Sequence, residues 1–156
     1  MLFRSLAAAG ADSRLSIQQT TFLNASNGHR LQMVAQTTPL MVAVGAGRYK
    51  QNYPQFTPAE EQSSIEAAQY ILDLGGDINA ANEYGQTALH AAAYLGADSI
   101  IRFLVGKGAR IDARDNFGQT ALSIAHRIHT VELGSNFDMQ PRRVYETTSQ
   151  LLLSLG

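Results

Sequence analysis

Two histidines, His126 and His129, are the residues whose spacing most resembles a reactive site. They stand three positions apart, which places two imidazoles on one face of a helix. Zinc sites take three or four ligands, and the nearest carboxylates, Glu132 and Asp138, fall in a segment expected to be a loop. We therefore expect no metal site here.

Other signatures of catalysis are missing from the full sequence. It has no cysteine, so disulfides, thiolate ligands and thiol nucleophiles are excluded. It has no Gly-x-Ser-x-Gly, P-loop or His-Glu-x-x-His motif. No strand is expected before Gly45-Ala46-Gly47, so this segment is not a dinucleotide fingerprint. Glu60 and Glu61 stand at an expected helix start, where carboxylates favour the helix dipole. We expect a protein that is not an enzyme and needs no cofactor.

The composition is that of one globular domain. The chain has 156 residues, of which 45% are hydrophobic and 16% charged, and its 12 Lys and Arg nearly balance 13 Asp and Glu. A formal net charge of −1 gives no electrostatic reason to expect nucleic acid or an anionic membrane as a partner. No apolar run approaches the roughly 18 residues of a membrane span. The sequence does not distinguish between the cytoplasm and the periplasm as the compartment of the protein.

An internal repeat decides the expected architecture. The segment beginning at Asn82 aligns with the segment beginning at Asp115, and Gly85 and Gly118 are 33 positions apart. The same period separates Gly75 from Gly108 and Ile78 from Ile111. Several independent positions agree in phase, so chance is a poor explanation.

The repeat resembles the ankyrin family. A period of 33 with a Thr-x-Leu-His-x-Ala core, here Thr87, Leu89, His90 and Ala92, is the signature of that family. The resemblance implies an all-α solenoid of helix-turn-helix units with β-turn or hairpin fingers. It is strongest over residues 75–128 and is interrupted on both sides, and the composition is similar to that of bacterial ankyrin proteins with long insertions.

The repeat divides the chain into units of one domain, 1–156. The expected units are a half repeat 1–13, a finger insertion 14–37, a repeat 38–80 with an insertion 47–62, a repeat 81–113, and a repeat 114–156 with an insertion 130–143. In the finger insertion, Asn27-Gly28 between two extended runs predicts a hairpin, with a flexible loop as the alternative. Neither end carries a polar capping repeat, so we expect a piece of a longer array.

The outer helices align in columns when their C-terminal glycines are superposed. The first column contains Leu6, Ile71, Leu104 and Leu152, the second Ala7, Leu72, Val105 and Leu153, and the third Phe3, Ala68, Ile101 and Ser149. Stacked repeats are expected to bury these columns, which single repeats cannot do.

The resemblance also implies where a partner would bind. Partners of the family usually contact the turn tips and the exposed side of the inner helices. The matching positions are Glu83, Tyr84, Gln86, Tyr94, Leu95, Asn116, Phe117, Gln119 and Arg127. Tyr84 and Phe117 would form an aromatic row, with ordinary turn packing as the alternative. His90 matches the family's structural histidine, and Gln36 replaces the usual turn glycine in the first repeat.

The insertions within the repeats carry further aromatic residues. Tyr49, Tyr53, Phe56 and Phe137 are of the types enriched in interface cores and could form a binding platform. The alternative is that each ring folds back to cover its own loop.

We therefore expect a protein–protein interaction scaffold with a partner of unknown identity. One alternative is a regulatory or structural segment of a larger enzyme. Another is a site for a peptide or small ligand at the insertions.

Overall fold

The computed structural model describes residues 16, 21–24, 30–46, 56–126 and 145–156. The predicted half repeat 1–13, the Asn27-Gly28 turn and the insertion 130–143 lie outside these ranges, as do residues 47–55 of the other insertion.

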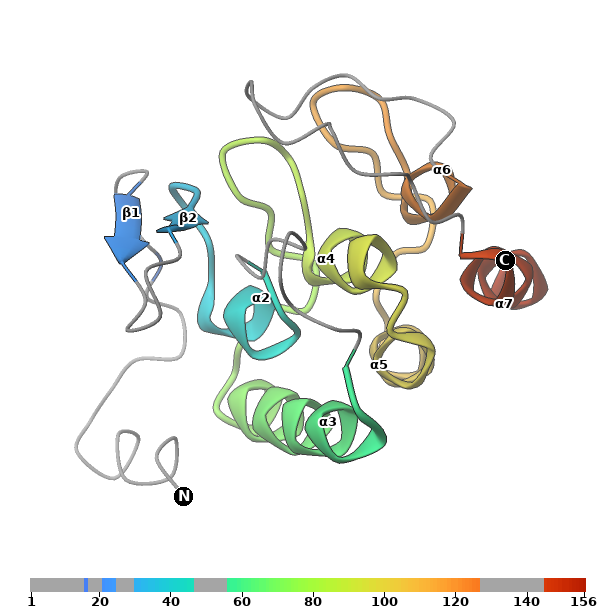
Figure 1. The fold of residues 1–156 in the computed structure, drawn as a ribbon, viewed down its shortest axis with the longest axis horizontal. Coiled ribbons are helices and arrows are strands. Elements are labelled where there is room, and N and C mark those ends of the chain that lie inside the picture. The colour runs from blue at the N-terminus through green and yellow to red at the C-terminus, as the bar shows by residue number, and fades with distance from the viewer. Residues whose placement is uncertain (1–15, 17–20, 25–29, 47–55, 127–144) are drawn as a thin grey trace.

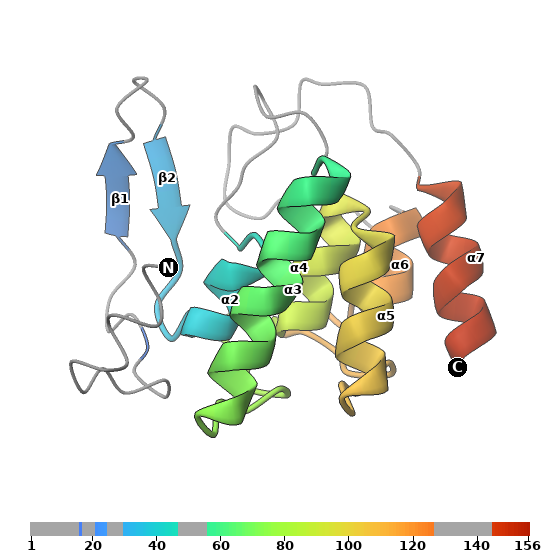
Figure 2. The ribbon, with the colours of Figure 1, turned by 90° about the horizontal axis from the view of Figure 1, so that it is seen from below.

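The helices of the described part form two layers. The inner layer contains α2 (Pro39–Ala43), α4 (Ala88–Leu95) and α6 (Ala121–His126). The outer layer contains α3 (Pro58–Asp73), α5 (Asp98–Gly106) and α7 (Glu146–Leu155). Each inner helix packs on the outer helix that follows it, and neighbouring pairs stand side by side (Figure 1, Figure 2). The prediction of a helical repeat protein is therefore confirmed for these residues.

Two short strands precede the helices. Strand β1 (Thr21–Asn24) pairs antiparallel with β2 (Arg30–Met33), with Thr21 opposite Met33. The pair lies beside α2, at the start of the row of helices (Figure 2).

The helix starts follow from their local sequence. The Thr38 hydroxyl accepts a hydrogen bond from the Met41 amide, and Pro39 occupies the first turn, where no amide hydrogen is needed. Thr57 and Glu60 form a capping box. The Glu60 carboxylate accepts a hydrogen bond from the Thr57 amide at 2.8 Å, and the Thr57 hydroxyl accepts one from the Glu60 amide at 3.2 Å. Since α3 begins at Pro58, residues 58–62 of the predicted insertion belong to that helix.

The outer helices bury the described members of two of the three predicted columns, whose first residues, Leu6, Ala7 and Phe3, lie outside the described residues. Ile71, Leu104 and Leu152 are all buried. The third column is also buried at Ala68, Ile101 and Ser149. The small residues of α4 let the layers approach closely, since Ala92 and Ala93 are fully buried.

The second column departs from the expectation at its end. Leu72 and Val105 are partly buried against the core, but Leu153 is 61% exposed. Leu153 lies on α7, the last outer helix, and no described helix packs on its far side. The last repeat therefore leaves this apolar side chain uncovered in the described part.

A polar contact also joins consecutive outer helices. The hydroxyl of Thr148, a fully buried residue of α7, donates a hydrogen bond to the carboxylate of Asp98 at the start of α5. A buried hydroxyl needs a hydrogen-bond partner. This pair therefore adds a directional hydrogen bond to an otherwise apolar contact between α5 and α7.

In the described part, none of the helices is both long and apolar enough to cross a bilayer.

Candidate interaction surface of the fingers and inner helices

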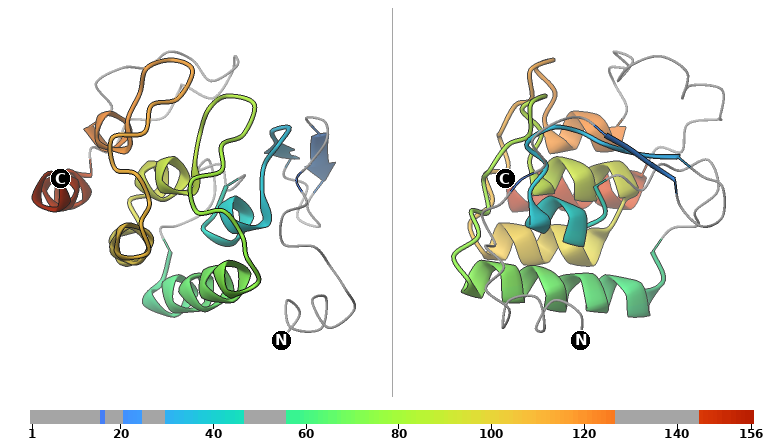
Figure 3. Two further views of the ribbon diagram at one scale, coloured as in Figure 1. Left: turned by 180° about the vertical axis from the view of Figure 1, so that it is seen from behind. Right: turned by 90° about the vertical axis from the view of Figure 1, so that its left-hand side faces the viewer.

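A long loop, called a finger here, joins each outer helix to the next inner helix. Two fingers are described in full, residues 76–87 and 109–120, and they stand at one end of the helix layers (Figure 3). Their tips, residues 82–86 and 115–119, carry most of the predicted partner-binding residues.

The two tips have the same hydrogen bonds. In the first, the Asn82 side-chain oxygen accepts from the amides of Tyr84 and Gln86, both at 3.0 Å. In the second, the Asp115 carboxylate accepts from Phe117 and Gln119, at 2.9 and 2.8 Å. A short side-chain acceptor that bonds the amide two residues on is the usual way that Asn and Asp close a turn.

Glycine completes each tip in the left-handed conformation. Gly85 has φ 76° and Gly118 has φ 75°, values that other residues rarely adopt. The two glycines thus occupy equivalent bends on adjacent units, as the period of 33 predicts. Gln36 stands at the corresponding place in the first repeat and has φ 63°, so it keeps the bend without the glycine.

Neighbouring tips are joined by backbone hydrogen bonds. The Asn116 amide donates to the Tyr84 carbonyl at 2.9 Å, and the Asn116 side chain donates to the Glu83 carbonyl at the same distance. On the other side, the Glu83 amide donates to the Ala35 carbonyl at 3.0 Å. The tips therefore form a continuous, hydrogen-bonded row across three repeats.

The aromatic residues of the two tips are in contact. The ring centroids of Tyr84 and Phe117 are 6.2 Å apart and the rings are tilted by 53°, an arrangement in the favourable range for aromatic pairs. Tyr84 is partly buried, while Phe117 remains 42% exposed. The pair is both ordinary tip packing and an exposed aromatic surface.

The exposure of the other predicted contact residues differs. Glu83 and Asn116 are exposed, and Gln86 and Tyr94 are partly buried. Leu95 and Gln119 are buried, at 8% and 7% exposure, so their side chains are not part of the exposed surface, and their contact with a partner stays a prediction. The Leu95 side chain packs beside Gly45, and the Gln119 amide donates a hydrogen bond to the Asp115 carboxylate. Arg127 lies outside the described residues.

His90 joins its own repeat to the next. Its Nδ1 accepts from the Thr87 amide at 3.1 Å, so its Nε2 carries the proton and donates to the Gln119 carbonyl at 3.1 Å. Burial lowers the pKa of His90 below its ordinary value, which favours this neutral form. The residue is therefore a structural bridge, as the resemblance implies.

The inner helices expose an uncharged surface that the sequence analysis missed. Helices α2, α4 and α6 contain no Asp, Glu, Lys or Arg, whereas each outer helix contains at least one. On this layer, Val42, Ala91 and Ile124 are equivalent, because each makes the first helical hydrogen bond back to the capping threonine. Val42 is 41% exposed and the other two are partly buried. We call these three residues the inner strip. These residues could have been found from the sequence, because each stands four positions after a capping threonine.

The two insertions within the repeats, 47–62 and 130–143, contribute one described aromatic residue. Phe56 is partly buried, packs against the core and lies close to Gly45. This packing agrees with the alternative of folding back, and a place for Phe56 in a binding platform stays a prediction. Tyr49, Tyr53 and Phe137 lie outside the described residues.

Metal ligands do not gather in the part of the chain that the structure describes, where no group of three histidine or carboxylate side chains lies close enough to hold an ion. His126 ends α6, while His129, Glu132 and Asp138 lie outside the described ranges.

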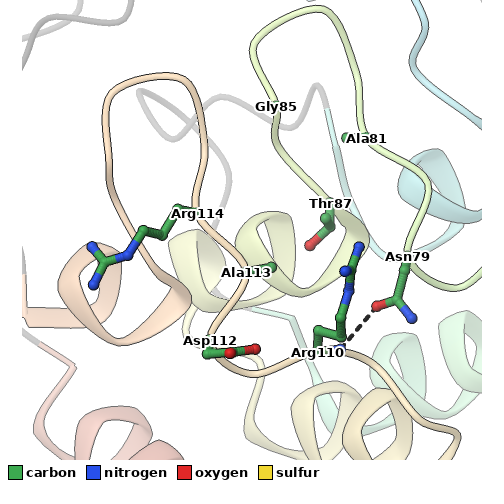
Figure 4. A pocket seen from close by; sticks show the side chains of 8 residues that line it. All are labelled: Asn79, Ala81, Gly85, Thr87, Arg110, Asp112, Ala113 and Arg114. Atoms are coloured by element: carbon green, nitrogen blue, oxygen red, sulfur yellow. Dashed lines mark hydrogen bonds between the residues drawn. The ribbon is translucent and has the colours of Figure 1, made fainter.

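A cavity of about 300 Å³ lies between the two fingers (Figure 4). Arg110 reaches toward Thr87 within it, and Arg114 points away. The Asn79 side-chain oxygen accepts from the Arg110 amide at 2.8 Å, and its nitrogen donates to the Gly108 carbonyl at 3.2 Å. Both polar atoms of the Asn79 side chain thus bond the neighbouring repeat. This side of the cavity is therefore another contact between repeats.

The contact between tips can be tested with two glycines. In Gly85→Ala the new methyl group would lie 2.6 Å from the Asn116 side-chain oxygen and 2.9 Å from its amide nitrogen, whereas Gly118→Ala meets nothing within 4 Å. Both variants lose about 1–2 kcal/mol from the left-handed backbone. We expect Gly85→Ala to lose about 1–3 kcal/mol more in denaturant unfolding, because the neighbouring tip must shift. Equal losses would show that the tips do not support each other.

Comparison with known proteins bears on the same residues. A family model described as ankyrin repeats, in three copies, matches residues 58–133. The match includes both fully described tips and His90. No curated protein matches the chain.

Proposed function

Because the chain is an ankyrin-repeat protein, we propose that it binds a protein partner through its tips and the exposed face of its inner helices. Ankyrin repeats are generally protein–protein interaction modules and are typically non-catalytic. Binding would be reversible and would need no cofactor.

The distribution of charge is the observation that carries this proposal. Helices α2, α4 and α6 pack against the outer layer and against one another, and their side chains that are not fully buried include no Asp, Glu, Lys or Arg, while Val42 is exposed. Depletion of charge and enrichment in aromatic residues are features of interface cores. The contact between Tyr84 and Phe117 adds an aromatic anchor held by backbone hydrogen bonds.

The tips are suited to act as anchors because they are held in place before a partner arrives. A side chain that is already ordered loses less freedom on binding than a mobile one. Phe117 stands on a turn closed by Asp115, and the neighbouring Asn116 bonds the preceding tip twice. The exposed ring is therefore presented at low entropic cost.

The overall charge supports a protein and not a nucleic acid as the partner. Nucleic-acid affinity depends on many Lys and Arg contacts to phosphates, whereas this chain has a net charge of −1.

The double variant Tyr84→Ala, Phe117→Ala tests the surface. Affinity capture from the source cells with the wild-type chain identifies the partner, and titration then compares the variants. We expect the double variant to bind at least about 30-fold more weakly, because buried aromatic anchors each contribute about 2 kcal/mol or more.

The control changes two exposed leucines of the outer layer, Leu74→Ala and Leu153→Ala, which are 45% and 61% exposed. These changes should leave affinity unchanged. The melting temperature should differ little between the two double variants. Normal affinity together with a large loss of stability in the aromatic variant would reject the surface.

A further inference from the structure

The row of tips ends, in the described part of the chain, at the tip of the second finger. Within the row, the Tyr84 and Glu83 carbonyls of the first tip each accept a hydrogen bond from Asn116 at 2.9 Å. The equivalent carbonyls of the second tip belong to Phe117 and Asn116, because the two tips have the same turn bonds and the same glycine bend. Among the described residues, neither of these two carbonyls receives a hydrogen bond.

This end of the row is exposed. Asn116 and Gly118 are exposed residues, and the Phe117 residue is 42% exposed. We call the Asn116 and Phe117 carbonyls, together with the Phe117 ring, the open end of the row. Backbone acceptors at such an edge are a template for a further segment of chain.

The contact between the two tips shows which chemistry fills an end of this kind. Asn116 donates its backbone amide to the Tyr84 carbonyl and its side-chain amide to the Glu83 carbonyl. The next residue, Phe117, places its ring against the Tyr84 ring. One asparagine followed by one aromatic residue thus makes all three contacts with the preceding tip.

The contact before it separates the backbone bond from the side-chain bond. The Glu83 amide donates to the Ala35 carbonyl at 3.0 Å, which repeats the backbone bond. A glutamate carboxylate has no hydrogen to donate, and the Val34 carbonyl, which is equivalent to that of Glu83, accepts instead from the Thr37 hydroxyl of its own turn at 2.6 Å. The second bond therefore requires a side chain that can donate, as asparagine does.

A second copy of this chain cannot fill the open end with its own equivalent tip. In that copy, the backbone amide and the side-chain amide of Asn116 are already bonded to Tyr84 and Glu83. We therefore assign the open end to a different protein.

We propose that the open end of the row binds a turn of a partner protein in which an asparagine is followed by an aromatic residue. The partner's asparagine donates its backbone amide to the Phe117 carbonyl and its side-chain amide to the Asn116 carbonyl. The partner's ring packs against the Phe117 ring. This inference rests on the proposed function and names the kind of segment that the tips recognise.

A peptide copied from the second tip provides the probe. Residues 114–120, Arg-Asp-Asn-Phe-Gly-Gln-Thr, are joined end to end, because a ring favours the turn and lowers the entropic cost of binding. In the control peptide, leucine replaces the asparagine and removes the side-chain donor at similar size. NMR titration of the full chain should give a Kd about five-fold lower for the asparagine peptide, the usual effect of one net hydrogen bond. Equal binding of the two peptides, or no saturable binding of either, would overturn the proposal.

The same titration locates the binding. The amides of Phe117 and Gly118 directly follow the two open carbonyls in the chain. Their chemical shifts should therefore change most when the asparagine peptide is added. If the largest changes fall on the inner helices or on the outer layer, the assigned site is wrong.

Two variants of the protein test the aromatic contact. Phe117→Ala should weaken the asparagine peptide about five-fold, because the pair of rings is lost. Leu74→Ala is the control, because Leu74 has a similar exposure, 45% against 42%, on the outer layer. An equal loss in both variants would contradict the proposal. A wild-type dimer that dissociates in Phe117→Ala, measured by light scattering, would instead assign the open end to self-association.

These experiments fail separately from the test of the proposed function. If the natural partner depends on Tyr84 and Phe117 but the two peptides bind alike, the tips remain a recognition surface and the asparagine–aromatic turn is wrong. If the peptides differ as expected but the natural partner does not respond to the aromatic double variant, the open end remains a binding site and the proposed function is wrong.

Discussion

Truncation of Leu104 to alanine is expected to lower the free energy of unfolding by about 2–5 kcal/mol. Leu104 is fully buried in α5, which packs against α3 on one side, α7 on the other, and α4 of its own repeat. Its truncation leaves a cavity in the core beside a helix that packs against three others. Repeat proteins depend on contacts between neighbours, so both interfaces of this repeat should weaken together.

Urea unfolding followed by circular dichroism measures this effect. The midpoint should fall while the slope of the transition stays constant, provided that the repeats unfold as one unit. Leu74→Ala is the matched control, since the same truncation at an exposed position should change stability by no more than about 0.5 kcal/mol. An unchanged midpoint in Leu104→Ala would contradict its place in the core.

Replacement of His90 by serine is expected to cost about 2–4 kcal/mol. The substitution copies the next repeat, in which Ser123 Oγ accepts from the Thr120 amide at 2.8 Å. The local helix start should therefore survive in His90→Ser. The bond to the Gln119 carbonyl and the packing of the ring are lost. The stability of this variant thus reports on the His90 contact between repeats and not on the helix cap within one repeat.

The pH dependence of stability reports on the same residue. Burial lowers the pKa of His90 from 6.5, although the Gln119 carbonyl and the Asp115 carboxylate act in the opposite direction. The unfolded chain therefore takes up a proton at higher pH than the folded protein. The contribution of neutral His90 is complete above pH 6.5 and is lost as the pH falls below it.

Melting temperatures between about pH 7 and about pH 5 check this sign. The wild type should lose more stability over this interval than His90→Ser, because the carboxylates are common to both proteins. Parallel curves for the two proteins would show that His90 does not titrate differently on folding.

Residues close together in the sequence allowed much of the fold to be predicted. The cap at Thr57 and Glu60 and the tip glycines Gly85 and Gly118 depend on bonds between residues at most four apart. Such bonds require particular residue types at fixed offsets, so their pattern can be recognised from the sequence alone. The same holds for the period that pairs Asn82 with Asp115.

The exposure of individual side chains required the tertiary structure. Leu95 and Gln119 occupy positions that resemble contact sites but are buried, and Leu153 belongs to a column that was expected to be buried but is exposed. In each case the outcome depends on what the neighbouring repeat or loop covers, and the residue's own repeat does not contain that information.

The amino-acid sequence by itself determined the repeat and its turns, because these rest on local hydrogen bonding and on a period of 33. The bond from His90 to the Gln119 carbonyl joins neighbouring repeats and depends on their packing. Only the tertiary structure decided which apolar residues form a surface. Val42, Ala91 and Ile124 are far apart in the chain and become neighbours only when three helices pack side by side. Exposure is a property of that packing and not of any single repeat.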